Sequence, residues 1–408
     1  MASDGLHSPT FPEHALLTCI ARHQLGESRT AKLRGLLSCS LDWNYLIDTA
    51  RTHGLIPLLY RQLSSVAADY PDIPIATLRQ ESLENCQSVL HLLSRLSEVL
   101  AIFKAEQIPV LLFKGPLLSE IAYGENSLRQ AGDLDLLIAI KDFDRARCAL
   151  ERLGYQMTPP LTKRQERAHL AFHCEIQFQR DNGFTVVDLH WSLSPKAFPF
   201  ALRVEEFFER AQAIVIAGQP AYTFDREDLI LFQCMHGAKH YWSRLEWIGS
   251  LAEIVRRQDV DWPTVIARAR ATRALKVLAL GFYLAKSVGD VAIPENVLRT
   301  LDPNGAINQV ANHTLESLFN PIEIEHESVM AIRKNFSIMD RKRDVVASLL
   351  RAVFVPTLSD WQTISLPTSL HPLYYALRPP RLVKVYAESI LRRTHDSAQP
   401  LTAMLPRT

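Results

Sequence analysis

Apolar side chains recur at helical spacing through the first hundred residues of the chain. The periodicity predicts helices over residues 15–22, 29–37 and 43–51, the last with Asp42 as its N-cap. A longer helix is expected over 83–107, where Leu90, Leu93, Leu96 and Val99 keep one face apolar. Residues 1–108 are therefore predicted to form an N-terminal helical lobe.

Between residues 109 and 225 the pattern changes to short apolar strands that alternate with helices. Strands are predicted over 110–113, 133–138, 174–179, 184–189 and 214–216, and helices from Pro116 and over 141–153. The run 180–183, which contains Asn182 and Gly183, is typical of a hairpin turn. A mixed sheet with helices on one side is the expected core of this region.

Helical periodicity returns after residue 225. Helices are predicted over 226–242, 244–257, 262–271, 273–288, 306–318, 325–335 and 340–354. The whole chain is thus predicted to be α+β: an α/β core at 109–225, flanked by the N-terminal lobe and a C-terminal helical lobe at 226–393. Residues 394–408 are expected to be a flexible tail.

Three carboxylates and a lysine are the candidate chemistry of the α/β core. Asp133 and Asp135 share one face of a strand, because strand side chains alternate. At about 4 Å and an effective dielectric of about 20, two such charges repel by about 4 kcal/mol, and a divalent cation removes this repulsion. Asp188 ends another apolar strand, and Lys114-Gly115 precedes a helix start suited to phosphate. Two unrelated, solvated aspartates remain the alternative for the Asp-x-Asp pair.

Composition narrows the picture without adding a function. The chain has 408 residues, 47% hydrophobic and 22% charged, and a net charge of +1, which excludes a global electrostatic attraction to nucleic acid. The six cysteines lack a Cys-x-x-Cys pair and are expected to be reduced and buried. No signal peptide or membrane-spanning run is recognised, so a cytoplasmic location is predicted.

The order of these residues resembles the DNA polymerase β-like nucleotidyltransferase superfamily. It is most similar to a family of uncharacterised bacterial nucleotidyltransferases with a Lys-Gly start, and the likeness extends over roughly residues 12–390. The residues that carry it are Lys114, Gly115, Arg129, Asp133, Asp135, Asp188, His190 and Trp191. The segment from His236 to Trp247 resembles the helical motif of the same family.

The resemblance implies a polymerase β-like fold and transfer of an NMP from an NTP to an acceptor hydroxyl. It implies that Asp133, Asp135 and Asp188 hold Mg²⁺ or Mn²⁺, as two ions, and carry catalysis. The implied nucleotide-binding residues are Lys114, Gly115, Arg129, Lys239, His240 and Arg244, with His190 as a possible addition. Pro116 stands where the superfamily has a serine, so Lys114 is expected to take over a triphosphate contact.

Several alternatives stay open. A metal-dependent glycosyltransferase also uses Asp-x-Asp, and a non-catalytic nucleotide-binding or partner-binding protein would keep the same fold. A zinc site at His236 and His240 is disfavoured, because Gly237 stands where the zinc peptidase motif needs glutamate. His173 and Glu175 are weaker site candidates. The acceptor (RNA, protein or peptide, sugar, or small metabolite), the NTP and the oligomeric state are not predicted.

Overall fold

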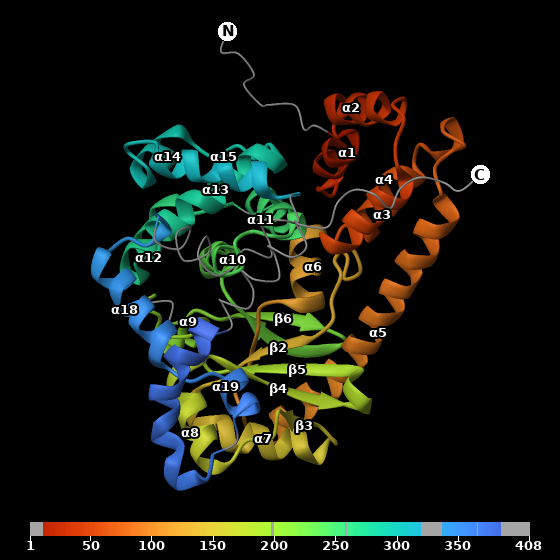
Figure 1. The fold of residues 1–408 in the computed structure, drawn as a ribbon. Helices are drawn as coiled ribbons and strands as arrows, with labels where there is room; N and C mark the ends of the chain where they lie inside the picture. The colour runs from red at the N-terminus through yellow and green to blue at the C-terminus, as the bar shows by residue number, and fades with distance from the viewer. Residues whose placement is uncertain (1–10, 197–199, 258, 320–336, 365, 385–408) are drawn as a thin grey trace, which may run out of the picture.

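The computed structural model describes residues 11–196, 200–257, 259–319, 337–364 and 366–384. In Figure 1 a central sheet lies beneath helices from both ends of the chain, and α7 (Phe143–Arg152) and α8 (Lys163–Phe172) lie below it. The predicted α+β class, a mixed sheet flanked by helices, is confirmed. The predicted lobe boundaries stay predictions.

The N-terminal helices follow the predicted order, with differences at their ends. They are α1 (Pro12–Ile20), α2 (Glu27–Leu37), α3 (Trp43–Thr52), α4 (Ile56–Ser64) and α5 (Ile75–Ala105), with the short 3-10 helix η1 (Ala67–Asp69). Asp42 caps α3 as predicted, because its carboxylate accepts the backbone N–H of Tyr45. Helix α5 begins eight positions earlier than residue 83, because polar residues at its start still continue the helix.

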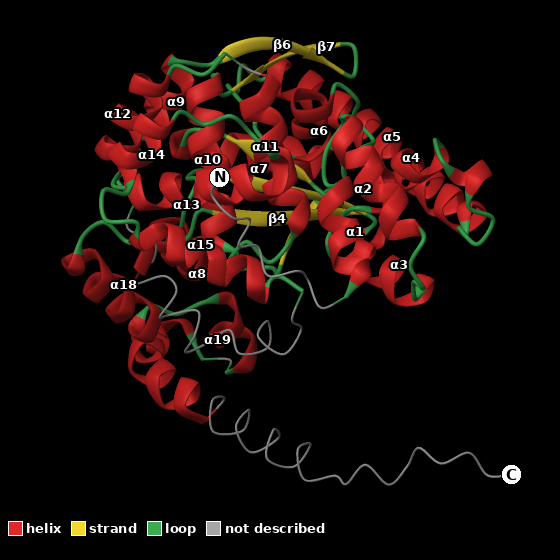
Figure 2. Ribbon diagram, turned by 90° about the horizontal axis from the view of Figure 1, so that it is seen from above, coloured by secondary structure: helices red, strands yellow, loops and turns green. Residues whose placement is uncertain are grey.

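Seven strands form one mixed sheet in the order β3-β4-β5-β2-β1-β7-β6. Their bounds are β1 (Leu111–Leu112), β2 (Leu134–Leu137), β3 (Gln156–Thr158), β4 (Glu175–Arg180), β5 (Thr185–His190), β6 (Gln212–Ile216) and β7 (Gln219–Thr223). Strand β2 runs parallel to β5 and antiparallel to β1. Strands β3 and β7 were not predicted, because both are short and lack an apolar run. The hairpin of β6 and β7 lies at one edge of the molecule (Figure 2).

The turn between β4 and β5 is the predicted hairpin. Its residues form the 3-10 helix η3 (Asp181–Gly183), in which Asp181 and Asn182 adopt φ of 56° and 55°. Asp and Asn tolerate this left-handed region better than most residues, so the sequence suits the turn. The hairpin fixes the register of β4 against β5, and this register places two candidate site residues side by side.

Both faces of the sheet are covered, so the expectation of helices on one side only was wrong. Along β1, Leu111 packs in the core shared with the helices of both chain ends, and Leu112 packs in a second core with α5 and α7. Leu137 and Leu136 of β2 are divided in the same way. Because strand side chains alternate, two buried cores on neighbouring residues require a cover on each face.

The C-terminal part is helical, as predicted. Its elements are α9 (Val204–Glu209), α10 (Arg226–Lys239), α11 (Leu245–Arg257), α12 (Trp262–Thr272), α13 (Leu275–Gly289), α14 (Glu295–Leu301), α15 (Ala306–Ser317), α18 (Lys342–Phe354), α19 (Leu358–Thr363) and the 3-10 helix η4 (Thr368–Leu373). Helices α14 and α19 and the 3-10 helix η4 are additions to the prediction, as is α9, which lies within the predicted α/β core. The predicted helix 325–335 and the tail 394–408 lie outside the described residues.

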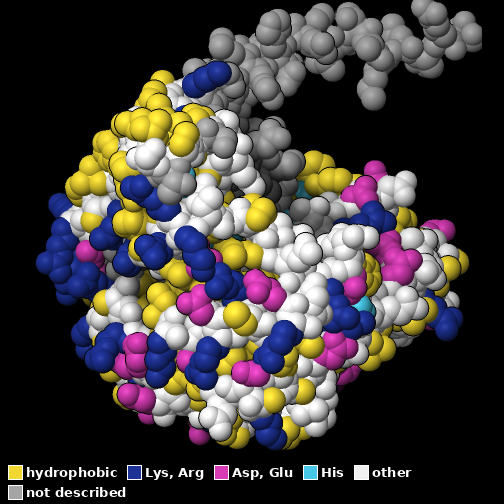
Figure 3. Space-filling model, turned by 90° about the horizontal axis from the view of Figure 1, so that it is seen from below, with side chains coloured by type: hydrophobic (Ala, Val, Ile, Leu, Met, Phe, Trp, Pro, Cys, Tyr) yellow, Lys and Arg dark blue, Asp and Glu magenta, His cyan; other side chains and the backbone are white. Residues whose placement is uncertain are grey.

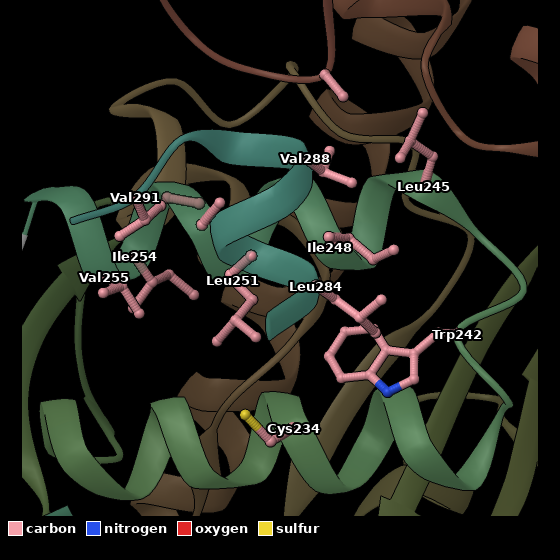
Figure 4. Close-up of a cluster of buried hydrophobic side chains, with 14 of the residues drawn as sticks. Cys234, Trp242, Leu245, Ile248, Leu251, Ile254, Val255, Leu284, Val288 and Val291 are labelled. Carbon is pink, nitrogen blue, oxygen red and sulfur yellow. The ribbon is translucent and has the colours of Figure 1, made fainter. Parts of the chain in front are cut away.

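Helices from the N- and C-terminal parts share one hydrophobic core. Figure 4 shows Cys234 of α10 and Leu251 of α11 facing each other, and Leu284 of α13 beside the ring of Trp242. Gly237 of α10 lets the buried ring of Trp242 approach, because a Cβ there would lie 2.6 Å from the indole. This packing holds α10 over the sheet, where its far end reaches the candidate site.

Helix α5 is long and apolar enough to cross a membrane by length and composition, unlike the sequence-based expectation. Its Leu96 and Phe103 pack in the core beneath the sheet, and Glu98 pairs with Arg180 of β4 at 3.0 Å. One third of its most apolar window is buried inside the protein. The face seen in Figure 3 carries charges of both signs interspersed with apolar side chains.

All six cysteines are free, as predicted. Cys19, Cys174 and Cys234 are buried, whereas Cys39 and Cys148 are exposed, so the expectation that they are buried holds for half of them.

Candidate active site

The acidic and histidine side chains of the candidate site come from three neighbouring strands. Asp135 of β2 is the register partner of Asp188 of β5, and His190 of β5 is the partner of Glu175 of β4. These four side chains and Asp133 share the face of the sheet toward α10. Their neighbours along the strands point into the opposite core: Leu134, Leu136, Ile176, Val187 and Leu189.

The start of helix α6 (Gly115–Tyr123) lies against the aspartates. Gly115 adopts φ of +60°, and a Cβ at this position would lie 3.2 Å from the carbonyl oxygen of Asp133. Glycine therefore allows the close approach and the turn together. Pro116 occupies the first turn of the helix, where a missing N–H costs no hydrogen bond. The N-terminus of this helix thus lies beside the aspartates.

Ionisable side chains form a continuous network of contacts across the site. Lys114 Nζ lies 2.7 Å from Asp135 Oδ1, and His190 Nε2 lies 3.0 Å from the same oxygen. His190 Nδ1 lies 3.0 Å from Glu175 Oε2, and Lys239 Nζ of α10 lies 3.5 Å from Glu175 Oε1. This network of contacts therefore connects α6, the three strands and α10.

Two carboxylates in this network of contacts are held in the charged form. Burial opposes ionisation of Asp135, but Lys114 and His190 outweigh it and hold the pKa of this carboxyl well below its usual range. Burial likewise acts against Glu175, yet His190 and Lys239 lower its pKa to about 2. Lys114 is buried too, and Asp135 raises the pKa of its ammonium despite that burial.

The other two carboxylates have the opposite electrostatics. Burial, followed by repulsion from Asp135 and Asp188, raises the pKa of Asp133 to about 7. Burial, followed by repulsion from Asp135, raises the pKa of Asp188 to about 6. Both groups thus lack cationic partners that are strong enough to offset their surroundings.

The donor set fits a divalent cation. Asp188 Oδ1 is buried without a hydrogen-bond partner, and ligand atoms of Asp135, Asp188 and His190 lie within 4.8 Å of one another. Oxygen-rich, anionic groups at this spacing are suited to Mg²⁺ or Mn²⁺. A cation would also relieve the repulsion that raises the pKa values of Asp133 and Asp188.

The two predicted arginines lie in a different ion pair. Arg129 Nε lies 2.8 Å from Glu246 Oε1 of α11, and both side chains are buried. Arg244 Nη2 lies 3.8 Å from the same carboxylate, and its Nε donates to the carbonyl of Thr52. The structure thus connects both arginines to α11. Their predicted contact with nucleotide stays a prediction.

The predicted residues of α10 reach the site to different degrees. Lys239 contacts Glu175, whereas the His240 ring packs against Trp247 at a centroid distance of 5.4 Å. Burial and then Lys239 lower the pKa of His240 to about 4, so this ring is neutral at physiological pH. His173 stacks on His169, and its Nε2 lies 3.3 Å from the carbonyl oxygen of Pro356.

Comparison with known proteins agrees with the resemblance noted in the sequence. Residues 40–290, more than half of the chain, match the family described as uncharacterised nucleotidyltransferases. The chain belongs to this family. No curated protein matches. A solution structure of the antibiotic-resistance factor ANT(2'')-Ia matches with 14% identity and a TM-score of 0.27, and the match covers 54% of this chain and 94% of that one.

Glu246 was missed in the sequence. Its side chain is 1% exposed and lies against Arg129, and a Cβ at Gly54 would lie 2.0 Å from its Oε2. The only signal available was its place in the motif Arg244-Leu245-Glu246-Trp247. Trp191, one of the residues that carry the family resemblance, is buried against Phe143 with a centroid distance of 5.4 Å, so it occupies a packing position.

Proposed function

We propose that this nucleotidyltransferase-family protein is a metal-dependent enzyme that moves an NMP from an NTP to an acceptor hydroxyl. The observation that carries the proposal is the meeting of Asp133, Asp135 and Asp188 on one sheet face beside Lys114 and the start of α6. Carboxylates for cations and backbone N–H groups for phosphate then lie side by side, as phosphoryl transfer needs.

The chain's own residues have separate roles in this reaction. Lys114, Lys239 and the N–H groups of α6 bind the triphosphate and balance its charge. Asp188, the register partner of Asp135, accepts the proton of the acceptor hydroxyl. The new bond joins the acceptor oxygen to the α-phosphorus, the bond from that phosphorus to the bridging oxygen breaks, and pyrophosphate leaves.

Asp133, Asp135 and Asp188 would hold the divalent cations. When bound, such cations supply charge neutralisation at the phosphate oxygens and orient the attacking and leaving oxygens. The carboxylates would keep the cations near the phosphate. The leucines on the opposite face of the same strands are buried in the core and exclude water there.

The metal-dependent glycosyltransferase alternative uses the same Asp-x-Asp pair for a nucleotide-sugar pyrophosphate. It leaves Lys114 and the close approach of α6 to Asp133 without a role. A non-catalytic nucleotide-binding protein would need the cation and phosphate groups but no base at Asp188. These alternatives give different results in one assay.

The assay incubates the purified protein with each of four α-³²P-labelled NTPs, Mg²⁺ or Mn²⁺, and an extract of its host. We keep the cytoplasmic location as part of the proposal, so the soluble fraction of the extract is the source of acceptor. Label is expected to enter an acceptor with the wild type and to be lost in Asp133→Ala and Asp188→Asn. Exposed Asp72→Asn is the matched control, with unchanged transfer.

Three outcomes separate the candidates. Transfer lost only in the site variants supports nucleotidyl transfer, and nuclease or protease sensitivity then identifies the acceptor class. NTP binding without transfer from any extract favours the non-catalytic alternative. Transfer of sugar from a labelled UDP-sugar, without NMP transfer, would favour the glycosyltransferase.

A further inference from the structure

His190 is the centre of the site, although no part of the proposed chemistry has used it. Its side chain is 3% exposed, and its ring packs edge-on against Phe113 with centroids 5.1 Å apart. Its two nitrogens face Asp135 on one side and Glu175 on the other, each at 3.0 Å. A buried imidazole between two carboxylates has its orientation fixed by both of them.

We propose that His190 is a metal ligand through Nε2 and that Glu175 is its positioning residue. This inference rests on the proposed function and names the metal class of the same site. A ring nitrogen of His190 lies with oxygens of Asp135 and Asp188 in a group whose ligand atoms are all within 4.8 Å of one another, and Nε2 is the nitrogen that faces Asp135. Asp188 Oδ1 is buried without a hydrogen-bond partner. These atoms surround one position for a cation.

The contact with Glu175 is the arrangement that a metal-bound imidazole needs. A histidine ligand offers one ring nitrogen to the metal and donates the N–H of the other to a carboxylate or carbonyl, which fixes the tautomer. Glu175 Oε2 lies 3.0 Å from Nδ1, and Nε2 lies 3.0 Å from Asp135 Oδ1, so Nε2 is the nitrogen on the side of the aspartates that would hold the cation. Glu175 is itself fixed by Lys239 at 3.5 Å and by its register pairing with His190.

A nitrogen ligand changes which cation the site prefers. Carboxylate-only sites suit Mg²⁺, whereas imidazole raises the affinity for Mn²⁺, Co²⁺ or Zn²⁺ relative to Mg²⁺. The site is therefore expected to bind Mn²⁺ at least about tenfold more tightly than Mg²⁺. The metal class is a transition metal with mixed nitrogen and oxygen ligands.

Pulsed electron paramagnetic resonance of the Mn²⁺-loaded protein tests this directly, without nucleotide or acceptor. The wild type is expected to show ¹⁴N modulation from a coordinated imidazole, and His190→Gln is expected to lose this modulation. The variant should still bind Mn²⁺, but with an affinity reduced by at least about tenfold. His313→Gln, an exposed histidine of α15, is the matched control and keeps both signals. Circular dichroism checks that each variant is folded.

Glu175 has its own test, because a positioning residue acts through the ligand. Glu175→Gln is expected to weaken Mn²⁺ binding by about 10–100-fold, measured by titration calorimetry, with ¹⁴N modulation reduced. Glu175→Asp, which keeps the carboxylate, is expected to recover part of the affinity. A merely structural role would change stability but leave the Mn²⁺ affinity and the nitrogen signal unchanged.

The outcomes separate this inference from the proposed function. Mn²⁺ that binds the wild type without ¹⁴N modulation, equal affinity for Mg²⁺ and Mn²⁺, or no Mn²⁺ binding at millimolar concentration each overturns it. If the protein transfers nucleotidyl groups but its bound Mn²⁺ shows no ¹⁴N modulation, the inference about His190 is refuted and the proposed function stands. If His190→Gln does not fold, ¹⁵N-histidine labelling of the wild type provides the second test, since the modulation must then change to that of ¹⁵N.

Discussion

Replacing Asp188 with asparagine is expected to make the metal-free protein more stable while abolishing transfer. Asparagine has nearly the shape of aspartate but carries no charge. In the folded protein, burial and Asp135 disfavour the Asp188 charge and raise its pKa from 3.8 to about 6. The substitution removes a charge that the fold holds at a cost, and it also removes the proposed proton acceptor.

The magnitude follows from the shift of the pKa. A shift of about two pH units corresponds to about 3 kcal/mol, because each unit is worth 1.36 kcal/mol. A carboxyl whose pKa is raised by folding binds more protons in the folded than in the unfolded protein, so stability is lost as the pH rises from about 4 to about 6. Asp188→Asn should therefore equal the wild type near pH 4 and exceed it by up to about 3 kcal/mol at pH 8.

Urea denaturation at pH 4 and pH 8, without metal and with saturating Mn²⁺, measures the effect. Mn²⁺ at about 100 times its dissociation constant should stabilise the wild type by about 2.7 kcal/mol and stabilise the variant less. The exposed control Asp72→Asn should match the wild type both in the pH dependence of its stability and in its stabilisation by Mn²⁺. A variant that is less stable than the wild type at pH 8, or equally stable at both pH values, would refute the electrostatic account of Asp188.

Three further substitutions test separate parts of the structure. Arg129→Met leaves the buried carboxylate of Glu246 with only the more distant Arg244 as a cation and should cost about 3–5 kcal/mol of unfolding free energy, much of it recovered by adding Glu246→Leu. No recovery would argue against a structural pair. Gly237→Ala places a Cβ against a buried tryptophan ring and should cost about 1–3 kcal/mol in urea denaturation, whereas Gly35→Ala, with open space around it, should be neutral or stabilising. Lys114→Met should weaken NTP binding in calorimetry by at least about tenfold, and unchanged affinity would remove this lysine from the phosphate site.

Much of the fold was readable from local patterns. The Asp42 cap, the hairpin turn and most of the helices were predicted, because each depends on residues that are neighbours in the sequence. Strands β3 and β7 were not, because their side chains are too polar or too few to give a period, and the sheet partners that stabilise them lie far away in the chain. The cover on both sheet faces also depends on tertiary packing.

The candidate site divides in the same way. The register that pairs Asp135 with Asp188 agrees with the prediction from strand ends, because side-chain direction along a strand has a simple period. The ion pair of Arg129 and Glu246 was not predictable, since it joins two segments whose approach is decided by the packing of α11. Local sequence therefore indicates which chemical groups a strand offers, and only the fold decides which partner each one meets.

The charges of the site explain why a protein keeps such an arrangement. Asp135 is stabilised by its contacts with Lys114 and His190, and Glu175 by its contacts with Lys239 and His190. Within the metal-free site, Asp133 and Asp188 are the carboxylates whose charges are poorly compensated. The same lysines are the groups proposed to bind phosphate. When an NTP and its cations bind, each lysine would move from a carboxylate to a phosphate group, and a cation would take the lysine's place beside the carboxylate. Charged groups would thus exchange partners, and no charge would be left uncompensated. A site that works as proposed would stay folded when empty and would bind metal and triphosphate best when both arrive together.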